Sequence, residues 1–163
     1  MAKRKKNKKD NLAPRIENRR AKRDYNLSGH LECGIVLQGS EVKSVRHARV
    51  SLAEGYAAVN PETMELWLHN VDIALYPQAG PLQHAPKNAR KLLCHKQQIK
   101  KLFGATTAKG VTLIPTAMYF NDAGMVKVEI AIAEGKRSYD KRDDIKQREM
   151  DREARRGMTR KTL

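Results

Sequence analysis

VTLIPTAMYF at residues 111–120 and MVKVEIAIA at residues 125–133 are two apolar runs separated by a connection of four residues, NDAG. A short connection that contains Gly124 is typical of a β-hairpin. In the second run every other residue is aliphatic, namely Val126, Val128, Ile130 and Ile132. Lys127 and Glu129 lie between them. Because successive residues of a strand point to opposite faces, this pattern predicts a hairpin with one face in the core and the other in water.

Two more runs have the pattern of strands, and two segments have the pattern of helices. ECGIVL at residues 32–37 is a short apolar run before Gly39, and MELWLH at residues 64–69 alternates apolar with polar or aromatic residues. Apolar residues recur at near-helical spacing over residues 87–103, with basic residues on the opposite side, which predicts an amphipathic helix. A shorter helix is predicted over residues 41–46.

Short strands, one long helix and the lack of strand–helix–strand alternation indicate the fold class. The sequence predicts a mainly β protein, a small antiparallel OB-like β-barrel with flanking α-helices and a disordered basic C-terminal tail. The predicted barrel domain covers residues 16–138. It lies between a disordered basic N-terminal tail at residues 1–15 and the C-terminal tail at residues 139–163.

The charge of the chain is concentrated at its two ends. Lys and Arg number 33 against 18 Asp and Glu, which gives a net charge of +15. Residues 1–29 hold 11 basic and 3 acidic residues, residues 134–163 hold 11 and 7, and the stretch between them holds 11 and 8. Two thirds of the basic residues therefore lie in end segments with few apolar residues. We expect these segments to order only on a partner.

The first nine residues, MAKRKKNKK, have three interpretations. They form a solubilising tail, a contact with a polyanion, or an attachment to a membrane surface. The membrane is disfavoured because residues 15–23 have almost no apolar face to insert. The sequence has no run of 18 apolar residues and no apolar leader, so we expect a cytoplasmic protein without a membrane partner.

Motifs for catalysis or metal binding are not found in the sequence. The five histidines lack metal-ligand spacing, and no phosphate-binding glycine pattern or nucleophile elbow is present. We therefore expect neither an enzyme nor a metal or cofactor. Cys33 and Cys94 are 61 positions apart, and a reducing compartment favours buried small hydrophobic residues over a disulfide. Basic segments that flank a barrel favour the recognition of RNA.

Several stretches together resemble one protein family. They are ENRRAKRDY (17–25), LECGIVLQGSEVKSVR (31–46), ELWLHNVDI (65–73), RKLLCHKQQI (90–99) and VKVEIAIAEGKRSYDKRDDIKQRE (126–149). In this order they are similar to the small protein B family, the bacterial partners of transfer-messenger RNA in trans-translation. The small departures from the family pattern are Ser40, Val45 and Cys94, and none of them changes a charge.

The resemblance implies a fold, two partners and a division of labour between barrel and tail. The barrel is implied to be of the oligonucleotide-binding type and to grip the tRNA-like domain of transfer-messenger RNA. The C-terminal tail is implied to enter the empty mRNA channel of a stalled ribosome. Positions that contact RNA in the family match Asn18, Glu32, Leu93 and Lys127. GKRSYDKR at residues 135–142 matches the element that approaches the decoding centre of the small subunit.

Three of the matched residues each have two interpretations. Lys127 meets a phosphate or is a solvated strand lysine. Glu32 accepts a hydrogen bond from a base amine or a 2′-OH, or orients an arginine, and the alternative is a surface salt bridge. Leu93 packs against a base or belongs to the core.

Further residues complete the predicted set. Basic residues expected to contact the RNA are Arg19, Arg20, Arg23 and Lys43. Contacts with the decoding centre and the mRNA channel are expected from Gly135, Lys136, Arg137, Tyr139, Asp140, Lys141, Arg142, Lys146 and Arg148. Tyr139 has few apolar neighbours, so we expect it to stack on a nucleobase, worth about 1–3 kcal/mol. The tail beyond it is too polar to hold an isolated helix and is expected to become helical on the ribosome.

The expected function is therefore that of a monomeric, non-enzymatic adaptor. It binds transfer-messenger RNA and delivers it to stalled ribosomes for their rescue. The alternative is a structural protein that binds rRNA permanently in the ribosome, and an enzyme that acts on RNA is a distant third.

Overall fold

The computed structural model describes residues 14–136, 149–150 and 153. The strands within residues 14–136 are β1 (Ile16–Glu17), β2 (Tyr25–Ile35), β3 (Val50–Ser51), β4 (Tyr56–Asn60), β5 (Glu65–His69), β6 (Asp72–Ile73), β7 (Arg90–Leu93), β8 (Val111–Phe120) and β9 (Val126–Gly135). The helices in the same range are α1 (Arg19–Asp24), α2 (Gly39–Arg46) and α3 (Lys96–Thr106), with a 3-10 helix η1 (Pro77–Leu82).

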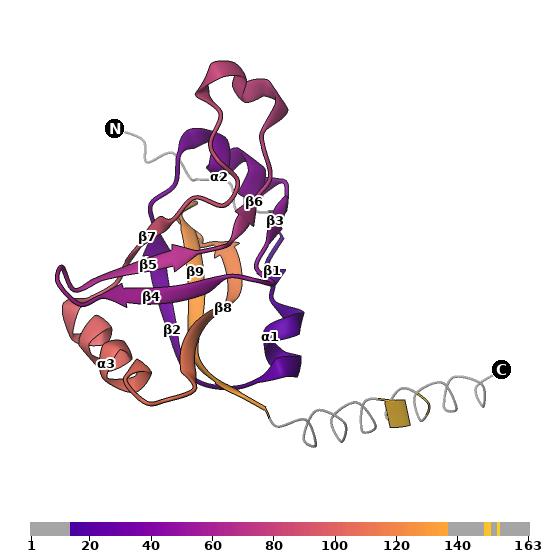
Figure 1. Cartoon of the computed structure of the whole chain (residues 1–163). Helices are drawn as coiled ribbons and strands as arrows, with labels where there is room; N and C mark the ends of the chain where they lie inside the picture. The colour runs from indigo at the N-terminus through magenta and orange to yellow at the C-terminus, as the bar shows by residue number, and fades with distance from the viewer. Residues whose placement is uncertain (1–13, 137–148, 151–152, 154–163) are drawn as a thin grey trace, which may run out of the picture.

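The main sheet closes on itself. Seven strands pair in the order β1-β8-β4-β5-β7-β2-β9, and β9 pairs with β8 as well as with β2. All these pairings are antiparallel. The predicted mainly β, antiparallel barrel with flanking helices is confirmed (Figure 1). Of the tail that was predicted to be disordered, residues 149–150 and 153 are described and are helical, and the rest lies outside the described residues.

The hairpin that defines the fold is formed as predicted. β8 has the predicted bounds, and β9 begins one residue later than expected and extends to Gly135. In the turn, the backbone N–H of Met125 donates to the side-chain oxygen of Asn121 over 2.8 Å, and Gly124 has a φ of 78°. A positive φ of this kind is readily adopted by glycine and explains the glycine in the connection.

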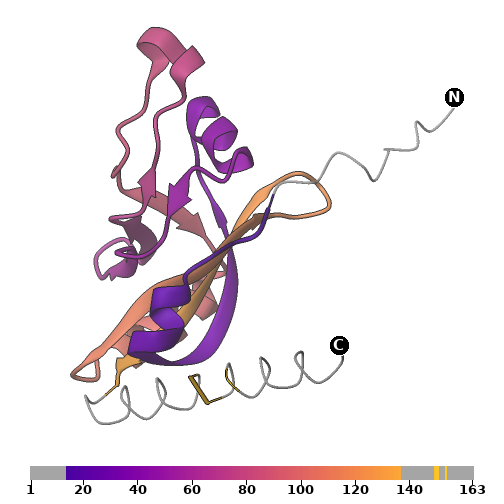
Figure 2. The ribbon, with the colours of Figure 1, turned by 90° about the vertical axis from the view of Figure 1, so that its right-hand side faces the viewer.

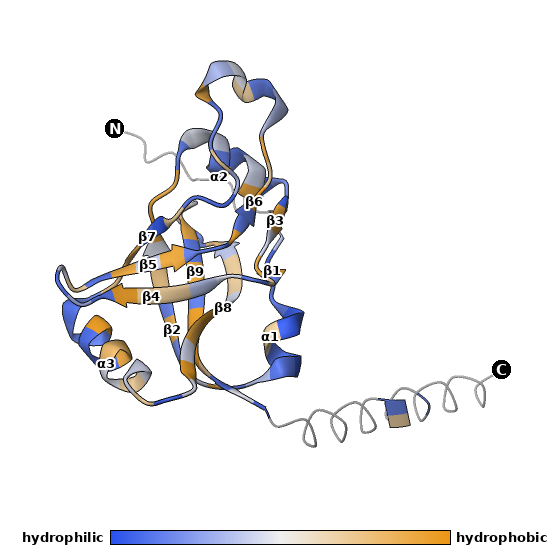
Figure 3. Cartoon of the chain, in the orientation of Figure 1, coloured by the Kyte–Doolittle hydropathy of each residue, from blue (hydrophilic) through white to orange (hydrophobic). Residues whose placement is uncertain are grey.

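The interior of the barrel is aliphatic. Leu66 and Leu68 of β5 and Val128 and Ile130 of β9 are fully buried. Burial of such a side chain contributes about 1.5–3 kcal/mol. The colouring by hydropathy in Figure 3 shows apolar segments along the strands and a mostly hydrophilic α1.

The predicted alternation along β9 changes near its end. It holds from Val126 to Ile130, but Ile132 is only partly buried, whereas Ala131 and Ala133 are fully buried. The reason is α1, which contacts β8 and covers the opposite face of the strands there. Ala133 packs with Ala21 and Ile114 in a second small apolar cluster.

The helix predicted over residues 87–103 is wrong in its first part. Arg90–Leu93 is strand β7, which pairs with β5 and β2, and the helix α3 begins only at Lys96. Leu92 faces the core, where it is 2% exposed, while Leu93 is 52% exposed on the outer face. The apparent helical spacing therefore combines a strand with a shorter helix, and the strand is required to bridge β5 and β2.

The expectation that residues 1–29 order only on a partner is wrong for the described part of that segment. Residues 16–29 form β1, α1 and the first half of β2. Residues 16–29 have few apolar side chains to bury, and they are ordered by backbone hydrogen bonds to neighbouring strands. β1 pairs with β8 and β2 pairs with β9 from Tyr25 onward. Figure 2 shows α1 and the long strands β2 and β9 side by side.

Helix α2 confirms the predicted short helix and begins slightly earlier. It covers Gly39–Arg46, and Glu41 at its third position accepts a hydrogen bond from the backbone N–H of Gln38 over 2.7 Å. This contact satisfies one of the free N–H groups of the first turn. In the described part of the chain, no helix is long and apolar enough to cross a membrane.

Candidate nucleic-acid interface

Three of the predicted RNA-binding residues come together on the outer face of the barrel. Glu32 lies on β2, Leu93 on β7 and Lys127 on β9. Gly34 of β2 is paired with both Leu93 and Lys127, so these two residues flank it. A cavity of about 390 Å³ opens here, and we call it the β2–β9 groove. The residues that line it include Gly34, Val42, Leu93, Met125, Val126 and Lys127.

The ammonium of Lys127 has an anionic neighbour in Glu32. The Nζ atom of Lys127 is 3.5 Å from Oε1 of Glu32, and the two side chains are 24% and 50% exposed. This is the surface salt bridge that was the alternative interpretation of Glu32. Exposed pairs of this kind contribute about 0–1 kcal/mol to stability, so Lys127 and Glu32 can separate to bind other groups at little cost in free energy.

Tyr119 also contacts Glu32 and is a residue that the sequence analysis missed. Its hydroxyl donates a hydrogen bond to Glu32, and this bond raises the pKa of Tyr119, so the phenol stays protonated. The guanidinium of Arg15 lies 4.6 Å from the centre of the tyrosine ring. Tyr119 is opposite Lys127 in the β8–β9 pairing, and this register would have identified it if the hairpin had been followed to its partner residues.

Leu93 is not a core residue. Its side chain is 52% exposed, while the preceding Leu92 is 2% exposed. The alternation along β7 explains the difference, because adjacent strand residues point to opposite faces. An exposed leucine next to Lys127 forms an apolar surface of the kind against which a nucleobase packs.

Glu129, a second acidic residue on the same face, contacts two basic side chains. Burial alone would raise the pKa of Glu129, but the hydrogen bond from Arg15 and the nearby His30 lower the pKa below its usual value. Nδ1 of His30 is 3.0 Å from Oε1 of Glu129, and Arg15 forms an ion pair with the same carboxylate. Neither Arg15 nor His30 was among the predicted residues.

Helix α2 presents basic residues beside the groove. Val42 lines the groove, and Lys43 and Arg46 on the same helix are exposed. Lys43 lies 5.0 Å from the ring centre of Tyr76, and Arg46 lies 5.4 Å from that of Phe120. Lys43 was predicted to bind RNA. Arg46 was missed, although it lies in the same predicted helix.

A buried ion pair fixes α2 to the barrel. Nε of Arg90 donates to Oε1 of Glu41 over 2.7 Å, and the two side chains are 2% and 4% exposed. Arg90 also donates to the backbone carbonyls of Val71, Asn88 and Pro86. The guanidinium is thus paired in charge and bonded to several acceptors, which is the arrangement that a buried arginine requires.

Asn18 lies apart from Glu32, Leu93 and Lys127, at the start of α1. It is 3% exposed and caps α1, since its side-chain oxygen accepts from the backbone N–H of Ala21 over 3.0 Å. Its amide nitrogen donates to the carbonyls of Leu52 and Pro115 over 2.9 and 3.0 Å. The predicted contact between Asn18 and RNA would require α1 to move away from these partners.

The basic residues of α1 form a second surface at the far end of β9. Arg19, Arg20 and Arg23 are exposed on this helix. The backbone N–H of Lys136 donates to the carbonyl of Asp24 over 3.1 Å, which brings Gly135 and Lys136 next to α1. We call these five residues the α1 surface. Its nearest residue on β9, Gly135, is eight residues from Lys127, about 26 Å along the strand at about 3.3 Å per residue.

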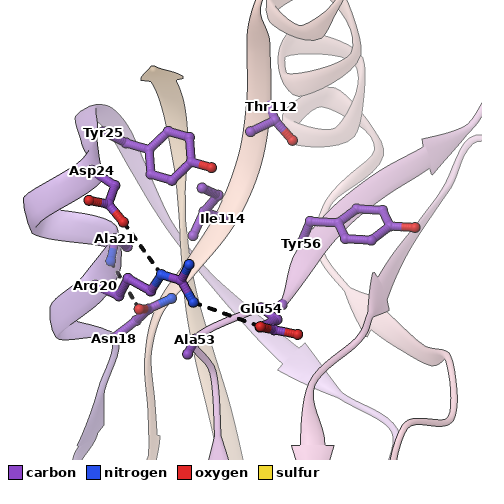
Figure 4. Close-up of a pocket in the computed structure, with 11 residues that line it drawn as sticks. Asn18, Arg20, Ala21, Asp24, Tyr25, Ala53, Glu54, Tyr56, Thr112 and Ile114 are labelled. Carbon is purple, nitrogen blue, oxygen red and sulfur yellow. Dashed lines mark hydrogen bonds and ion pairs between the residues drawn. The ribbon is translucent and has the colours of Figure 1, made fainter. Parts of the chain in front are cut away.

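A cavity of about 370 Å³ adjoins the α1 surface. Figure 4 shows Arg20 between two carboxylates, with Nε 3.4 Å from Oδ2 of Asp24 and Nη1 3.7 Å from Oε1 of Glu54. Tyr25 and Tyr56 also line this cavity and were not predicted. The two rings and the guanidinium of Arg20 offer flat faces to the cavity, against which a planar group can stack.

Several predicted residues lie outside the described part of the chain. They are Arg137, Tyr139, Asp140, Lys141, Arg142, Lys146 and Arg148. Their contacts with the decoding centre and the mRNA channel stay predictions. Among the residues that the structure describes, no group of three or more His, Cys, Asp or Glu side chains could hold a metal ion.

Comparison with known proteins links the chain to one family. The family model described as SmpB protein matches residues 15–160. The SsrA-binding protein of Rhodopseudomonas palustris is 48% identical over 137 residues, which cover 84% of this chain and 86% of that protein. The SsrA-binding protein of Symbiobacterium thermophilum is 48% identical over 150 residues, which cover 92% and 94%.

A solved structure is also similar. It is described as "tmRNA-SmpB: a journey to the center of the bacterial ribosome", and it superposes with a TM-score of 0.66 at 40% sequence identity. The match covers 77% of this chain and 87% of that one.

Proposed function

Because the chain belongs to the SmpB protein family, we propose that it binds transfer-messenger RNA and delivers it to stalled ribosomes for trans-translation. In this proposal the protein is an RNA-binding adaptor in the cytoplasm and catalyses no reaction. The similarity to SsrA-binding proteins and to the solved tmRNA-SmpB structure supports transfer-messenger RNA and the ribosome as partners.

The observation that carries the proposal is that Leu93 and Lys127 line the β2–β9 groove and that Glu32 forms an ion pair with Lys127 at its edge. Three separate strands contribute a cation, an acceptor and an exposed apolar side chain at one place. We propose that the tRNA-like domain of transfer-messenger RNA binds here. Lys127 exchanges its weak pair with Glu32 for a phosphate, which releases a condensed counterion from the RNA.

Glu32 has a separate role in the proposed contact. A carboxylate beside a phosphate is unfavourable, so Glu32 must face a donor of the RNA, a base amine or a 2′-OH. The hydrogen bond from Tyr119 keeps the carboxylate oriented on the outer face of β2. A 2′-OH partner would favour RNA over DNA at this position.

The C-terminal tail, with Gly135 and Lys136 just before it, forms the proposed contact with the ribosome, whereas Arg19, Arg20 and Arg23 of α1 are proposed to contact the RNA. The bond between Lys136 and Asp24 joins the end of the barrel domain, just before the tail, to the basic helix. In this proposal Asn18 acts by holding α1 in place, so that Arg19, Arg20 and Arg23 face outward. Residues 16–138 act as the RNA-binding domain, and residues 139–163 act in the mRNA channel of the small subunit.

The test of the proposed groove compares two lysine variants. Lys127→Ala should lower the affinity for a transcript of the tRNA-like domain and reduce the slope of log K against log salt by about 0.7–0.9. Lys101→Ala removes the same charge from an exposed position of α3 and should leave the slope unchanged. Equal slopes and affinities for Lys127→Ala and the unaltered protein would show that Lys127 is a solvated strand lysine and would reject the groove as the RNA site.

A further inference from the structure

The strand register brings the two cysteines of the chain together. β2 and β7 are antiparallel, with Gly34 opposite Leu93 and Ile35 opposite Leu92. The same register, continued by one residue, places Cys33 opposite Cys94. Their Sγ atoms are 2.7 Å apart, with the thiol of Cys94 donating to Cys33, and both cysteines are free. Their separation of 61 positions in the sequence concealed this contact.

The two thiols have unlike surroundings. Cys33 is 0% exposed and belongs to the core, whereas Cys94 is partly exposed at the edge of the core. The contact with Cys94 and then burial raise the pKa of Cys33, while the contact with Cys33 lowers the pKa of Cys94. An accessible thiol with a lowered pKa is the one that an oxidant attacks first, and a buried neighbour is placed to resolve it.

The backbone geometry suits a disulfide without movement of the strands. Opposed residues in an antiparallel pair have Cα atoms about 4.5–5.5 Å apart, and disulfides bridge Cα atoms about 4.4–6.8 Å apart. The next two residue pairs along β2 and β7 are already in register. A bond between the two sulfur atoms would therefore require only side-chain adjustment.

We propose that Cys33 and Cys94 form a modification site at which a hydroperoxide, ROOH, converts the thiol pair into a disulfide. In the first step the Cys94 thiolate attacks the terminal peroxide oxygen, the S–O bond forms and the O–O bond breaks. The leaving alkoxide takes up the proton lost by Cys94 and departs as ROH. Cys94 is then a sulfenic acid.

In the second step the sulfur of Cys33 attacks the sulfenyl sulfur of Cys94. The S–S bond forms, the S–O bond breaks, and the hydroxide that leaves takes up the thiol proton of Cys33 as water. In total, two thiols are oxidised by two electrons and the peroxide is reduced to ROH and water. Thiols of the cell reverse the reaction by exchange.

The site lies next to the β2–β9 groove but does not depend on the proposed RNA contact. Gly34 and Leu93, the residues that follow Cys33 and precede Cys94, both line that groove. The disulfide would join β2 to the residue that follows β7, beneath Leu93. The chemical test below needs no RNA, so its result is separate from that of the lysine experiment.

The test uses the full chain, reduced and then freed of reductant. It is treated with one equivalent of hydrogen peroxide, denatured in iodoacetamide and weighed by intact mass spectrometry. We expect a monomeric product that lacks two thiol hydrogens, takes up no alkyl group and regains two alkylatable thiols in dithiothreitol. Two thiols that stay alkylatable after peroxide, or disulfides found only between chains, would overturn the proposal.

Two variants test the order of the steps. In Cys33→Ser the sulfenic acid of Cys94 has no resolving thiol and should be trapped by dimedone. In Cys94→Ser the buried Cys33 should react with peroxide much more slowly. Equal rates in the two variants would overturn the assigned order. The experiment on the unaltered chain decides the existence of the site even if one variant does not fold.

Discussion

Removal of the carboxylate of Glu41, which is buried between α2 and the barrel, should strongly lower the free energy of unfolding. Glu41→Ala leaves the guanidinium of Arg90 at 2% exposure without its counter-charge. Loss of one partner of a buried ion pair costs about 3–5 kcal/mol. The carbonyls of Val71, Asn88 and Pro86 still accept from Arg90, so the cost should not exceed this range.

Urea unfolding followed by circular dichroism measures the effect. With an m-value of about 2 kcal/mol/M, a loss of about 4 kcal/mol lowers the midpoint by about 2 M. Glu65→Ala is the matched control, because Glu65 pairs with Lys91 on the outside of the barrel, where the side chains are 32% and 38% exposed. That change should cost less than about 1 kcal/mol.

The two variants together decide whether burial gives the pair its importance. Glu41→Gln keeps an oxygen for Arg90 and should fall between the other two. If Glu41→Ala loses no more stability than Glu65→Ala, the reasoning that α2 is anchored through a desolvated charge is refuted.

Three further changes test other parts of the molecule. Asn18→Ala should lower the free energy of unfolding by about 1–3 kcal/mol, because it removes the cap of α1 and two buried hydrogen bonds; an unchanged urea midpoint would contradict this. The pKa of Glu129 is lowered in the folded protein, so its ionised carboxylate stabilises the fold above the usual pKa of 4.5, and this contribution is lost as the pH falls through the folded-state pKa. The difference in the free energy of unfolding between the unaltered protein and Glu129→Gln should therefore shrink as the pH is lowered in acid unfolding experiments. A difference that stays constant with pH would refute this. Deletion of residues 140–163 should leave the melting temperature and the affinity for transfer-messenger RNA nearly unchanged and abolish peptide tagging of stalled chains; a parallel loss of affinity and tagging would place the tail in the RNA-binding surface.

The parts of the fold that depend on local pattern were predictable from sequence. The hairpin of β8 and β9 follows from alternation and a short glycine-containing turn, both of which lie within residues 111–133. The helix predicted over residues 87–103 failed because β7 is specified by distant partners. Arg90 is buried only because Glu41, 49 positions earlier, neutralises it, and nothing near residue 90 in the sequence indicates this.

The candidate site shows the same division between local and distant information. The sequence alone identifies Lys127 as a cation on the solvent-facing side of a strand. Its contacts with Glu32 and the position of Leu93 beside it depend on the pairing of β2 with both β7 and β9. The same pairing joins Cys33 to Cys94, and it could not be derived from the spacing of the cysteines.

Sequencing of the RNA that co-purifies with the protein is the most direct test of the proposed function. The protein is recovered from cells with its bound RNA, and its amount is compared with that of the ribosomes in the same lysate. We expect transfer-messenger RNA to dominate the recovered RNA, the protein to be substoichiometric to ribosomes, and the enrichment to fall in the Lys127→Ala variant. Recovery of rRNA alone, with one protein per ribosome, would contradict an adaptor and identify a permanent ribosomal component.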